Sequence, residues 1–583
     1  MKKTAIAAAL ILAVSAMAFG CGDPKTPARD ERLIEVEGLA ETYYPNLEKL
    51  DEENAEEVLA GKVDVDLIFG TTYDGWKAVA DAYSRLQPGV SVELHDHSDS
   101  TYNESVTNAA RDDSTDWDIF HGNRLGTRLN SVGYNFTSTL QSDNHYAGLS
   151  DDPDLDPGTS RTWQEVLERD AYITDKSGSN TACYTLNSES LSTAWFVNKT
   201  AFADAVKEGY LNAEGKPETP KTWEDLINLC ACMVKAGYTH PLGLSGNEAS
   251  VNASQFAWLF RIYGDQYYRD MYPAINVQEG DKIWADTSYD FNFDLDATQP
   301  ETDRGYNPSH TRFWNSVLDE NETYGAAKNI PYVGAKSDKF ACMLENFYRL
   351  KPYLPVDFAT VDFATLEDRF ASNTSKSAPM ILLDYTGYGL SFGLQERNFE
   401  IDFFDYPMMT CAHEEKHVTA TLVRDVGGNG GYLSAINHKD EMQNKINVDF
   451  VKFFMSPYGQ SVYYSALKTA HQAPSGLSTV LNVAVPEDWQ TFYESDKIAF
   501  NGLCDVNWYN NLFIYHVNGL DTTISEHLTA VQNLYKADGT SADAVLGFQT
   551  RWDAAVREGF SKLCETMKWS KDIWMKPGDK VSA

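Results

Sequence analysis

The chain has 583 residues, of which 85 are acidic and 48 are basic, and its formal net charge at pH 7 is −37. Hydrophobic residues make up 43% and charged residues 23% of the sequence, a composition typical of a globular protein with material for several cores. A chain this acidic is not attracted to phosphate backbones or anionic lipid, so we expect no nucleic-acid partner.

The N-terminus has the pattern of a secretion signal. Lys2 and Lys3 precede a small, apolar stretch over residues 5–18 that is too short for a comfortable membrane span. Ala18-Phe19-Gly20-Cys21 then resembles the bacterial lipoprotein signal, although the family prefers Leu and a smaller residue where Ala18 and Phe19 stand. We expect removal of residues 1–20 and lipidation of Cys21, with plain secretion as the alternative. The lipid would then be the membrane attachment of an extracytoplasmic protein.

Residues 21–62 are polar and acidic and predict a lipid-anchored tether. Regular structure begins next, with strands expected at 63–69, 90–94 and 117–120 and helices at 76–86 and 102–111. Strands that alternate with helices predict an α/β fold with a mostly parallel sheet. Ligands of such sheets bind at the carboxyl ends of the strands.

The cysteines beyond Cys21 number seven, so at least one is unpaired in a monomer, and their density is below that of a disulfide scaffold. Cys230 and Cys232 lie two residues apart in a helical pattern, where their side chains point in different directions. We therefore expect buried thiols without metal or redox chemistry.

Several short motifs occur in the order in which one protein family carries them. Residues 220–226 read PKTWEDL, similar to PKTWDEL in that family, and residues 235–241 read KAGYTHP, similar to KAGYTP. Other such segments are 67–70, 76–83, 87–92, 116–119, 194–199, 378–384, 428–436 and 450–460. Together they resemble the extracellular solute-binding proteins of bacterial ABC importers, in particular the carbohydrate-binding, maltose-binding-protein-like family 1.

The resemblance implies a type II periplasmic-binding-protein-like fold, in which two interleaved α/β lobes are joined by a hinge. We expect the first lobe to comprise residues 63–190 and 360–428, with 378–384 as a strand that returns to it. The second lobe would comprise residues 191–359 and 429–583, with insertions. The 264–350 segment either lengthens the cleft or decorates a lobe.

Candidate ligand-binding residues follow from the strand ends and from the resemblance. Hydroxyl-rich ligands need charged or amide partners and aromatic faces. The candidates are Tyr73, Asp74, His121, Asn123, Arg124, Glu189, Trp195, Asn247, Gln255, Trp258, Asp384, Tyr385, Tyr388, Asn429 and Trp508. Ordinary structural roles compete at each position. Asp74 suits a helix N-cap, Trp258 a helix core and His121 a loop hydrogen bond.

Three patterns point to other chemistry. Residues 413–417 read HEEKH and match the H-E-x-x-H zinc motif, but β-like sequence follows where a buried helix is needed. Residues 389–393 read GLSFG, although a nucleophile elbow requires the strand to lead directly into it. Asp290, Asn292, Asp294 and Glu301 have calcium-loop spacing without its glycine, and the same stretch fits an exposed strand.

We therefore expect a binding protein, not an enzyme, that captures a carbohydrate, expected to be an oligosaccharide, and delivers it to an ABC transporter permease. No cofactor is expected, and the protein is expected to be monomeric. The alternatives are another polar solute, a surface zinc hydrolase that uses residues 413–417, and an adhesin that captures glycans without a transporter.

Overall fold

The structure is a computed structural model that describes residues 31–40, 43, 45, 60–97, 117–122, 129–168, 171–175, 182–247, 255–269, 316–318, 332–373, 375–410, 423, 429–493, 521–536 and 539–566. The chain divides into a short unit, Met1–Glu35, and a main unit, Val36–Ala583, to which all elements below belong. Among the described helices, none combines the length and apolarity that crossing a membrane requires.

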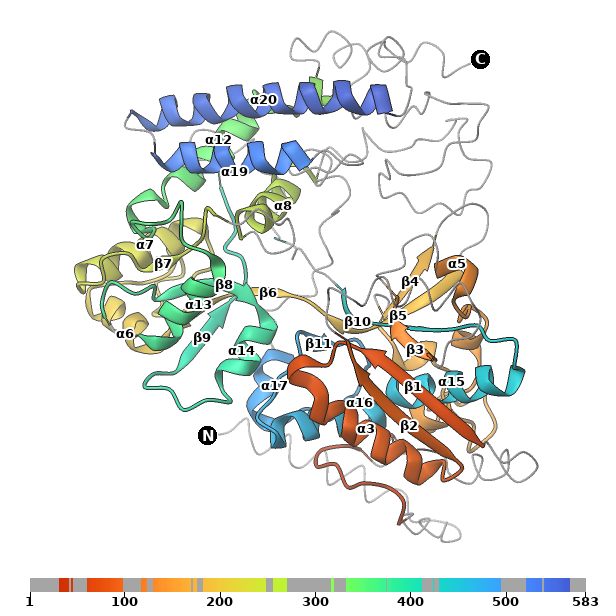
Figure 1. Ribbon diagram of the computed structural model, residues 1–583. Coiled ribbons are helices and arrows are strands. Elements are labelled where there is room, and N and C mark those ends of the chain that lie inside the picture. The colour runs from red at the N-terminus through yellow and green to blue at the C-terminus, as the bar shows by residue number, and fades with distance from the viewer. Residues whose placement is uncertain are drawn as a thin grey trace. The chain divides into compact units, whose positions relative to one another are not determined.

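The first sheet has seven strands in the order β11-β5-β10-β3-β1-β2, with β4 paired to β5 (Figure 1). The bounds are β1 Gly61–Leu67, β2 Val90–Asp96, β3 Ile119–His121, β4 Tyr172–Asp175, β5 Ala182–Ser190, β10 Asn429–Ala435 and β11 Leu477–Ser478. Strands β2 and β3 flank β1 in parallel, as the alternation of strands and helices predicts. The sheet is nonetheless mixed, because β10 runs antiparallel to both β3 and β5.

Helices cover this sheet with aromatic side chains. They are α3 Tyr73–Leu86, α5 Leu129–Val132, α15 Glu441–Phe454 and α16 Pro457–Thr469, with 3-10 turns η2 Gly70–Thr72, η5 Thr139–Gln141, η6 His145–Ala147 and η7 Gln164–Val166. The apolar positions of α3 recur at helical spacing and are buried. Trp76 of α3 stacks on Phe454 of α15 at 4.3 Å between ring centroids, so the helices pack through rings. The helix predicted at 102–111 lies outside the described residues.

The second sheet has four strands in the order β7-β8-β6-β9. The strands are β6 Thr193–Asn198, β7 Leu242–Gly243, β8 Ile381–Tyr385 and β9 Ile401–Phe404. Strand β6 lies between β8 and β9 and is antiparallel to both, whereas β7 and β8 are parallel. All six residues of β6 are buried, so this strand is the centre of the sheet.

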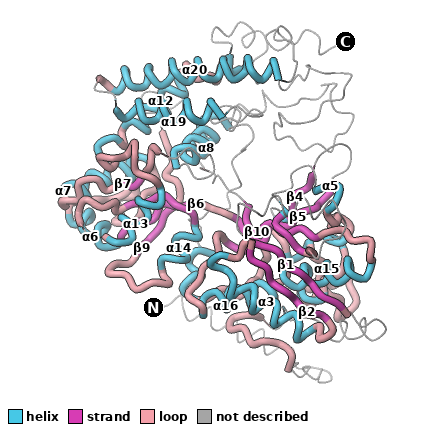
Figure 2. Tube along the Cα trace, in the orientation of Figure 1, coloured by secondary structure: helices cyan, strands magenta, loops and turns pink. Residues whose placement is uncertain are grey.

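Figure 2 shows helices α6, α7 and α13 around strands β7 and β9 of the second sheet. The remaining described helices are α6 Lys199–Lys207, α7 Trp223–Lys235, α8 Gln255–Tyr268, α12 Asp338–Tyr348, α13 Phe363–Ser372, α14 Thr386–Phe392, α17 Glu487–Tyr493, α19 Asp521–Lys536 and α20 Ser541–Thr566, with the turn η11 Lys351–Tyr353. One large hydrophobic cluster joins α7, α8, α12, α19 and α20 to strands β6 and β8.

Helix α7 illustrates how the local sequence sets an element. The Thr222 side chain accepts the backbone N–H of Asp225, and the Asp225 carboxylate accepts the backbone N–H of Thr222, which forms a capping box. Further along the helix, Cys230 and Cys232 are free and buried, which confirms the prediction of buried thiols. Cys342 of α12 is disulfide-bonded.

The expected assignment of the returning segments to lobes is wrong. Residues 381–404 supply β8 and β9, which pair with β6 in the second sheet rather than with the first. Residues 429–435 supply β10, which lies between β3 and β5 in the first sheet. An apolar run indicates a buried strand, but it does not encode which sheet the strand joins. The two interleaved α/β sheets are confirmed, because each is built from segments far apart in the sequence.

Candidate functional site

The chain passes from one sheet to the other between Ser190, the last residue of β5, and Thr193, the first residue of β6. Two later segments pack tightly against this crossover. A side chain at Gly476 would place its Cβ 2.3 Å from the carbonyl oxygen of Ser190, and one at Gly387 would place it 2.2 Å from that of Ser475. Glycine is therefore needed at both positions, and the 474–476 loop lies between the end of β5 and the start of α14.

Glu189 holds this loop from the end of β5. The side chain is buried, and its carboxylate accepts hydrogen bonds from the backbone N–H groups of Ser475 and Gly476. Burial raises the pKa of Glu189 to about 7, although the two backbone hydrogen bonds favour the charged form. We correct the expectation of a ligand contact here, because the structure gives this carboxylate a positioning role in the crossover.

Three other predicted contacts belong to the core of the second sheet. Trp195 is fully buried and stacks on Phe404, and Trp258 is 1% exposed. The Gln255 amide is fully buried, accepts the backbone N–H of Ser245 at 2.7 Å and donates to the carbonyl of Leu383 at 2.7 Å. Side chains with no exposed face cannot pack on a solute, so these expectations are corrected.

The carboxyl end of β8 combines a half-buried ring with a buried acid. Tyr385 ends the strand and meets Trp258 edge to face, with ring centroids 4.7 Å apart. Burial raises the pKa of Tyr385 to about 12, and the charge of Arg261 on α8 opposes this effect. Asp384, one residue earlier, is 1% exposed and therefore cannot contact a solute. This corrects the expectation that Asp384 binds the ligand.

The buried acid faces a second carboxyl. Asp384 Oδ1 accepts the backbone N–H of Tyr385 at 2.6 Å, while its side chain is hydrogen-bonded to Glu367 of α13. Burial and the negative charge of Glu367 raise the pKa of Asp384 well above its usual value. Burial likewise raises the pKa of Glu367. Sequence reasoning missed Glu367, which stands in a helix without a motif.

At the first sheet, the strand ends present accessible groups. Tyr73 follows β1 and is 45% exposed, with its ring against Phe69 at 6.0 Å. Asp74 accepts a hydrogen bond from Gln472 Nε2 at 2.8 Å. His121 ends β3 and lies 5.0 Å from the ring of Tyr432 on β10. Tyr432 was not among the predicted contacts, although it lies in the family-like segment 428–436.

At the second sheet, Asn247 is exposed after β7 and donates to the Thr360 carbonyl at 3.1 Å. Tyr388 of α14 is half-buried, packs on Phe196 at 5.8 Å and donates its hydroxyl to the Glu367 carbonyl at 3.4 Å. Burial raises the pKa of Tyr388 above its usual range. Tyr385, Tyr388 and Asn247 thus remain the candidates of this sheet with some exposure.

The remaining predicted residues lie outside the described part of the structure. They are Cys21, Asn123, Arg124, the 413–417 motif, Trp508 and the calcium candidates Asp290, Asn292, Asp294 and Glu301. Asn429 begins β10, and its side chain is not described.

The GLSFG string does not form a nucleophile elbow. Ser391 lies in the last turn of α14 and donates its hydroxyl to the Tyr388 carbonyl at 2.8 Å. An elbow requires the serine at the turn directly after a strand. Here β8 ends at Tyr385, and a turn and a half of helix separates the two, so the geometry argues against a serine hydrolase at this string.

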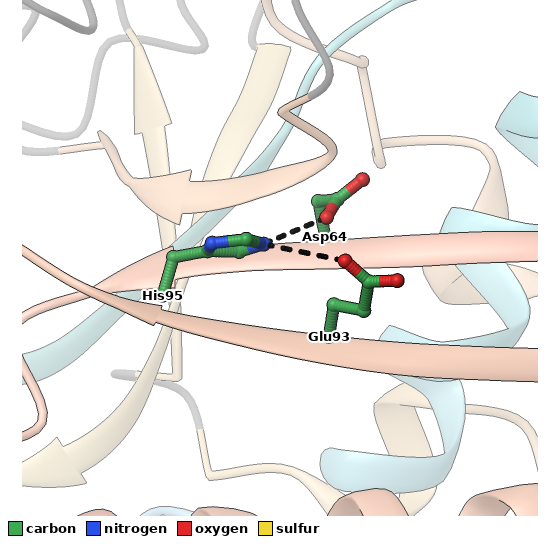
Figure 3. A group of neighbouring side chains, drawn as sticks. All are labelled: Asp64, Glu93 and His95. Carbon is green, nitrogen blue, oxygen red and sulfur yellow. Dashed lines mark hydrogen bonds and ion pairs between the residues drawn. The ribbon is translucent and has the colours of Figure 1, made fainter.

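Among the described residues, one group has the donor types and spacing of a metal site. Figure 3 shows His95 of β2 directed at Asp64 of β1, with Glu93 beside them. His95 Nε2 is 2.8 Å from Asp64 Oδ1 and 4.0 Å from Glu93 Oε2. Lys62 Nζ is 3.0 Å from Asp64 and 3.4 Å from Glu93. This ammonium already offsets part of the carboxylates' charge, and His95 contacts both acids, so ordinary ion pairs and hydrogen bonds account for the group.

The sequence pattern matches a known family over a large segment. Residues 70–341 match the model of the bacterial extracellular solute-binding protein family. This match confirms the resemblance. It begins just after β1, includes the crossover from β5 to β6, and ends in the first turn of α12. Among curated proteins, none matches this chain.

Solved structures of similar arrangement include a family 1 extracellular solute-binding protein from Bifidobacterium longum subsp. infantis. It is 12% identical, covers 85% of this chain and 99% of its own, and has a TM-score of 0.46. A manno-oligosaccharide-specific protein from Bifidobacterium animalis subsp. lactis with mannotriose is 12% identical, covers 89% and 99%, and has a TM-score of 0.46. Apo RafE from Streptococcus pneumoniae is 12% identical, covers 85% and 98%, and has a TM-score of 0.46.

Proposed function

We propose that this extracellular solute-binding protein captures a carbohydrate, expected to be an oligosaccharide, and delivers it unchanged to an ABC transporter permease. The observation that carries the proposal is the family match over residues 70–341. Members of this family bind solutes outside the cytoplasm, so the chain acts as a receptor with an extracytoplasmic location.

The chemistry of the strand ends supports a sugar as the solute. Tyr73 offers an exposed aromatic face at the first sheet, and Tyr385 a half-buried one at the second. Aromatic rings pack against the C–H faces of sugars. Asp74 and Asn247 offer a carboxylate and an amide for hydroxyl groups, and His121 with Tyr432 adds a mixed polar and aromatic pair. We propose these six residues and Tyr388 as solute contacts.

The mechanism we propose is closure of the two α/β halves around the sugar, with motion at the crossover. Hinges absorb backbone changes over a few residues between rigid elements. The segment from Ser190 to Thr193 is short and joins β5 of the first sheet to β6 of the second. Its tight packing against Gly476 and the hydrogen bond from the Thr386 backbone N–H to the Ser192 carbonyl would limit the range of this motion.

The experiment that tests the function is equilibrium dialysis of the purified protein, residues 22–583, against raffinose and mannotriose. We expect one sugar to be retained in stoichiometric amount and to be recovered chemically intact. Cleaved sugar, particularly together with stoichiometric zinc, would contradict the proposal in favour of a hydrolase. Retention of another polar solute in place of any sugar would move the proposal to that solute class.

We also propose that Cys21 carries a lipid that tethers the protein. The supporting observation is the lipoprotein-like segment 18–21 behind an apolar stretch. Replacing Cys21 with Ala removes the thiol that would be acylated, and we expect the variant protein to lose its membrane association. The measurement is fractionation of cells that express either form. Equal membrane association of both forms would overturn the tether, and replacement of Cys183, a buried free cysteine, provides the control.

A further inference from the structure

At the carboxyl end of β8, two acidic side chains from different elements meet. Ile381 and Leu383 face the large hydrophobic cluster, and because side chains alternate along a strand, Asp384 lies on the opposite face. Helices α13 and α14 both contact β8, and Glu367 comes from α13. The Tyr388 hydroxyl of α14 donates to the Glu367 carbonyl at 3.4 Å, so strand and helices meet at one point.

The hydrogen bonds of Asp384 leave one oxygen without an ordinary donor. Oδ1 accepts the backbone N–H of Tyr385, whereas Oδ2 is buried and receives no N–H or O–H from the residues that the structure describes. Its hydrogen-bonding neighbour is the carboxyl of Glu367. Two carboxylates in contact repel when both are charged, so a shared proton is required to satisfy the pair. Asp384 is the more buried of the two and therefore holds this proton, which it donates to Glu367.

The charged surroundings do not supply a substitute for the proton. On α13, the negative charge of Asp368 adds to the repulsion at Glu367. Arg397, beyond α14, acts on Tyr388, and Arg261 of α8 acts on Tyr385. Both cations thus favour ionisation of the neighbouring phenols, while the two carboxyls face each other.

We propose that Asp384 and Glu367 form a one-proton clasp that fastens the carboxyl end of β8 to α13 and so positions Tyr385 for the solute. Loss of the proton as the pH rises would place two charges in contact and loosen this junction. Asp384 is a positioning residue, because its contacts are to Tyr385 and Glu367. The step from the clasp to solute affinity rests on the proposed function.

The sign of the pH effect follows from the raised pKa of both groups. A carboxyl with a raised pKa in the folded state stabilises the fold below its unfolded pKa, and this contribution is lost as the pH rises through the folded pKa. Stability should therefore fall as the pH rises through the folded pKa of the pair. Asp384→Asn keeps an oxygen for the Tyr385 N–H and supplies an amide N–H to Glu367, so this variant should not show the loss.

The first experiment records thermal unfolding from about pH 6 to about pH 9, without sugar, for the wild type, Asp384→Asn and Asp402→Asn. Asp402 of β9 is the matched control, since its Oδ1 accepts the backbone N–H of Phe403 at 2.9 Å in the same sheet. We expect the melting temperature of the wild type and of Asp402→Asn to fall with pH, and that of Asp384→Asn to fall less. Superimposable profiles would overturn the clasp.

Infrared difference spectra between the wild type and Asp384→Asn provide an independent readout at neutral pH. A band of a protonated carboxyl group in the wild type supports the shared proton, and its absence contradicts it. If Asp384→Asn fails to fold, Glu367→Gln carries the same two comparisons, because its amide can donate to Asp384.

Binding of raffinose and mannotriose over the same pH range tests the positioning of Tyr385. We expect the affinity of the wild type for the bound sugar to fall about tenfold toward alkaline pH and that of Asp384→Asn to stay level. If the wild-type affinity does not change with pH although unfolding shows that the clasp titrates, Asp384 does not position Tyr385 for the sugar. If neither sugar binds although the infrared band is present, the proposed function fails for these sugars. The proposed positioning of Tyr385 then fails for them too, whereas the shared proton is supported.

Discussion

Buried carboxylates are neutralised in different ways in the two sheets. In the first sheet, Asp64 contacts Lys62 and His95, and Asp66 contacts His97 at 2.6 Å. In the second sheet, Asp384 meets another carboxyl. A carboxylate with cationic or N–H partners can remain charged when buried, whereas a carboxyl pair must keep a proton. The buried carboxylates of the first sheet therefore have donor partners, whereas the end of β8 depends on protonation.

The largest effect is expected at Asp118, which precedes β3 in the first sheet. Its Oδ2 accepts the backbone N–H of Asp64 at 2.8 Å, and its Oδ1 accepts the amides of Asn447 at 3.0 Å and Gln443 at 3.1 Å. Asp118→Ala leaves these buried donors unsatisfied and should reduce the free energy of unfolding by about 3 kcal/mol. Urea unfolding at neutral pH measures the loss. An unchanged midpoint would break the comparison, because hydrogen bonds to buried carboxylates would then not hold the first sheet.

A smaller, pH-dependent effect is expected at the Asp66–His97 contact. Burial raises the pKa of Asp66 to about 6, while His97 favours the charged form. The stability from Asp66 is present below its unfolded pKa and is lost as the pH rises through about 6, and His97 limits that loss. His97→Ala should therefore cost about 2 kcal/mol at pH values above 6 and little in acid. Unfolding of both proteins across this range tests the expectation, and an equal cost at all pH values would contradict it.

The smallest effect on stability is expected at Tyr73, which is exposed and contacts the ring of Phe69. Tyr73→Ala should leave unfolding within about 0.5 kcal/mol of the wild type, as is usual for surface positions. Loss of an aromatic face should nevertheless weaken sugar binding by about tenfold, which corresponds to about 1.4 kcal/mol. Calorimetric titration measures the affinity, and Tyr348→Ala, a half-buried tyrosine of α12, is the control. Equal affinities for Tyr73→Ala and the wild type would remove Tyr73 from the site.

Local sequence was sufficient to predict strands β1, β2 and β3 of the first sheet and helix α3. The apolar alternation of β1 and the helical spacing of α3 are properties of adjacent residues, and the structure has these elements at the predicted places. The same reasoning failed for β8, β9 and β10, because strand pairing between distant segments depends on tertiary contacts that periodicity does not encode.

The candidate site was predicted less well, for a physical reason. Trp195 and Trp258 have the residue type of a sugar platform, but an aromatic ring at a strand or helix position fills a core equally well. Exposure separates Tyr73 from these rings, and exposure follows from packing. No sequence motif marks Glu367, because its role depends on its contact with Asp384, which lies on a different element.

The most direct test of the central claim is thermal unfolding of residues 22–583 with a panel of mono- and oligosaccharides. A sugar at about 100 times its dissociation constant stabilises the folded protein by about 2.7 kcal/mol. We predict a rise in melting temperature with one family of sugars and none with unrelated ones. No rise with any sugar, together with a loss of stability on adding a metal chelator, would contradict the account and point to a metal-dependent protein.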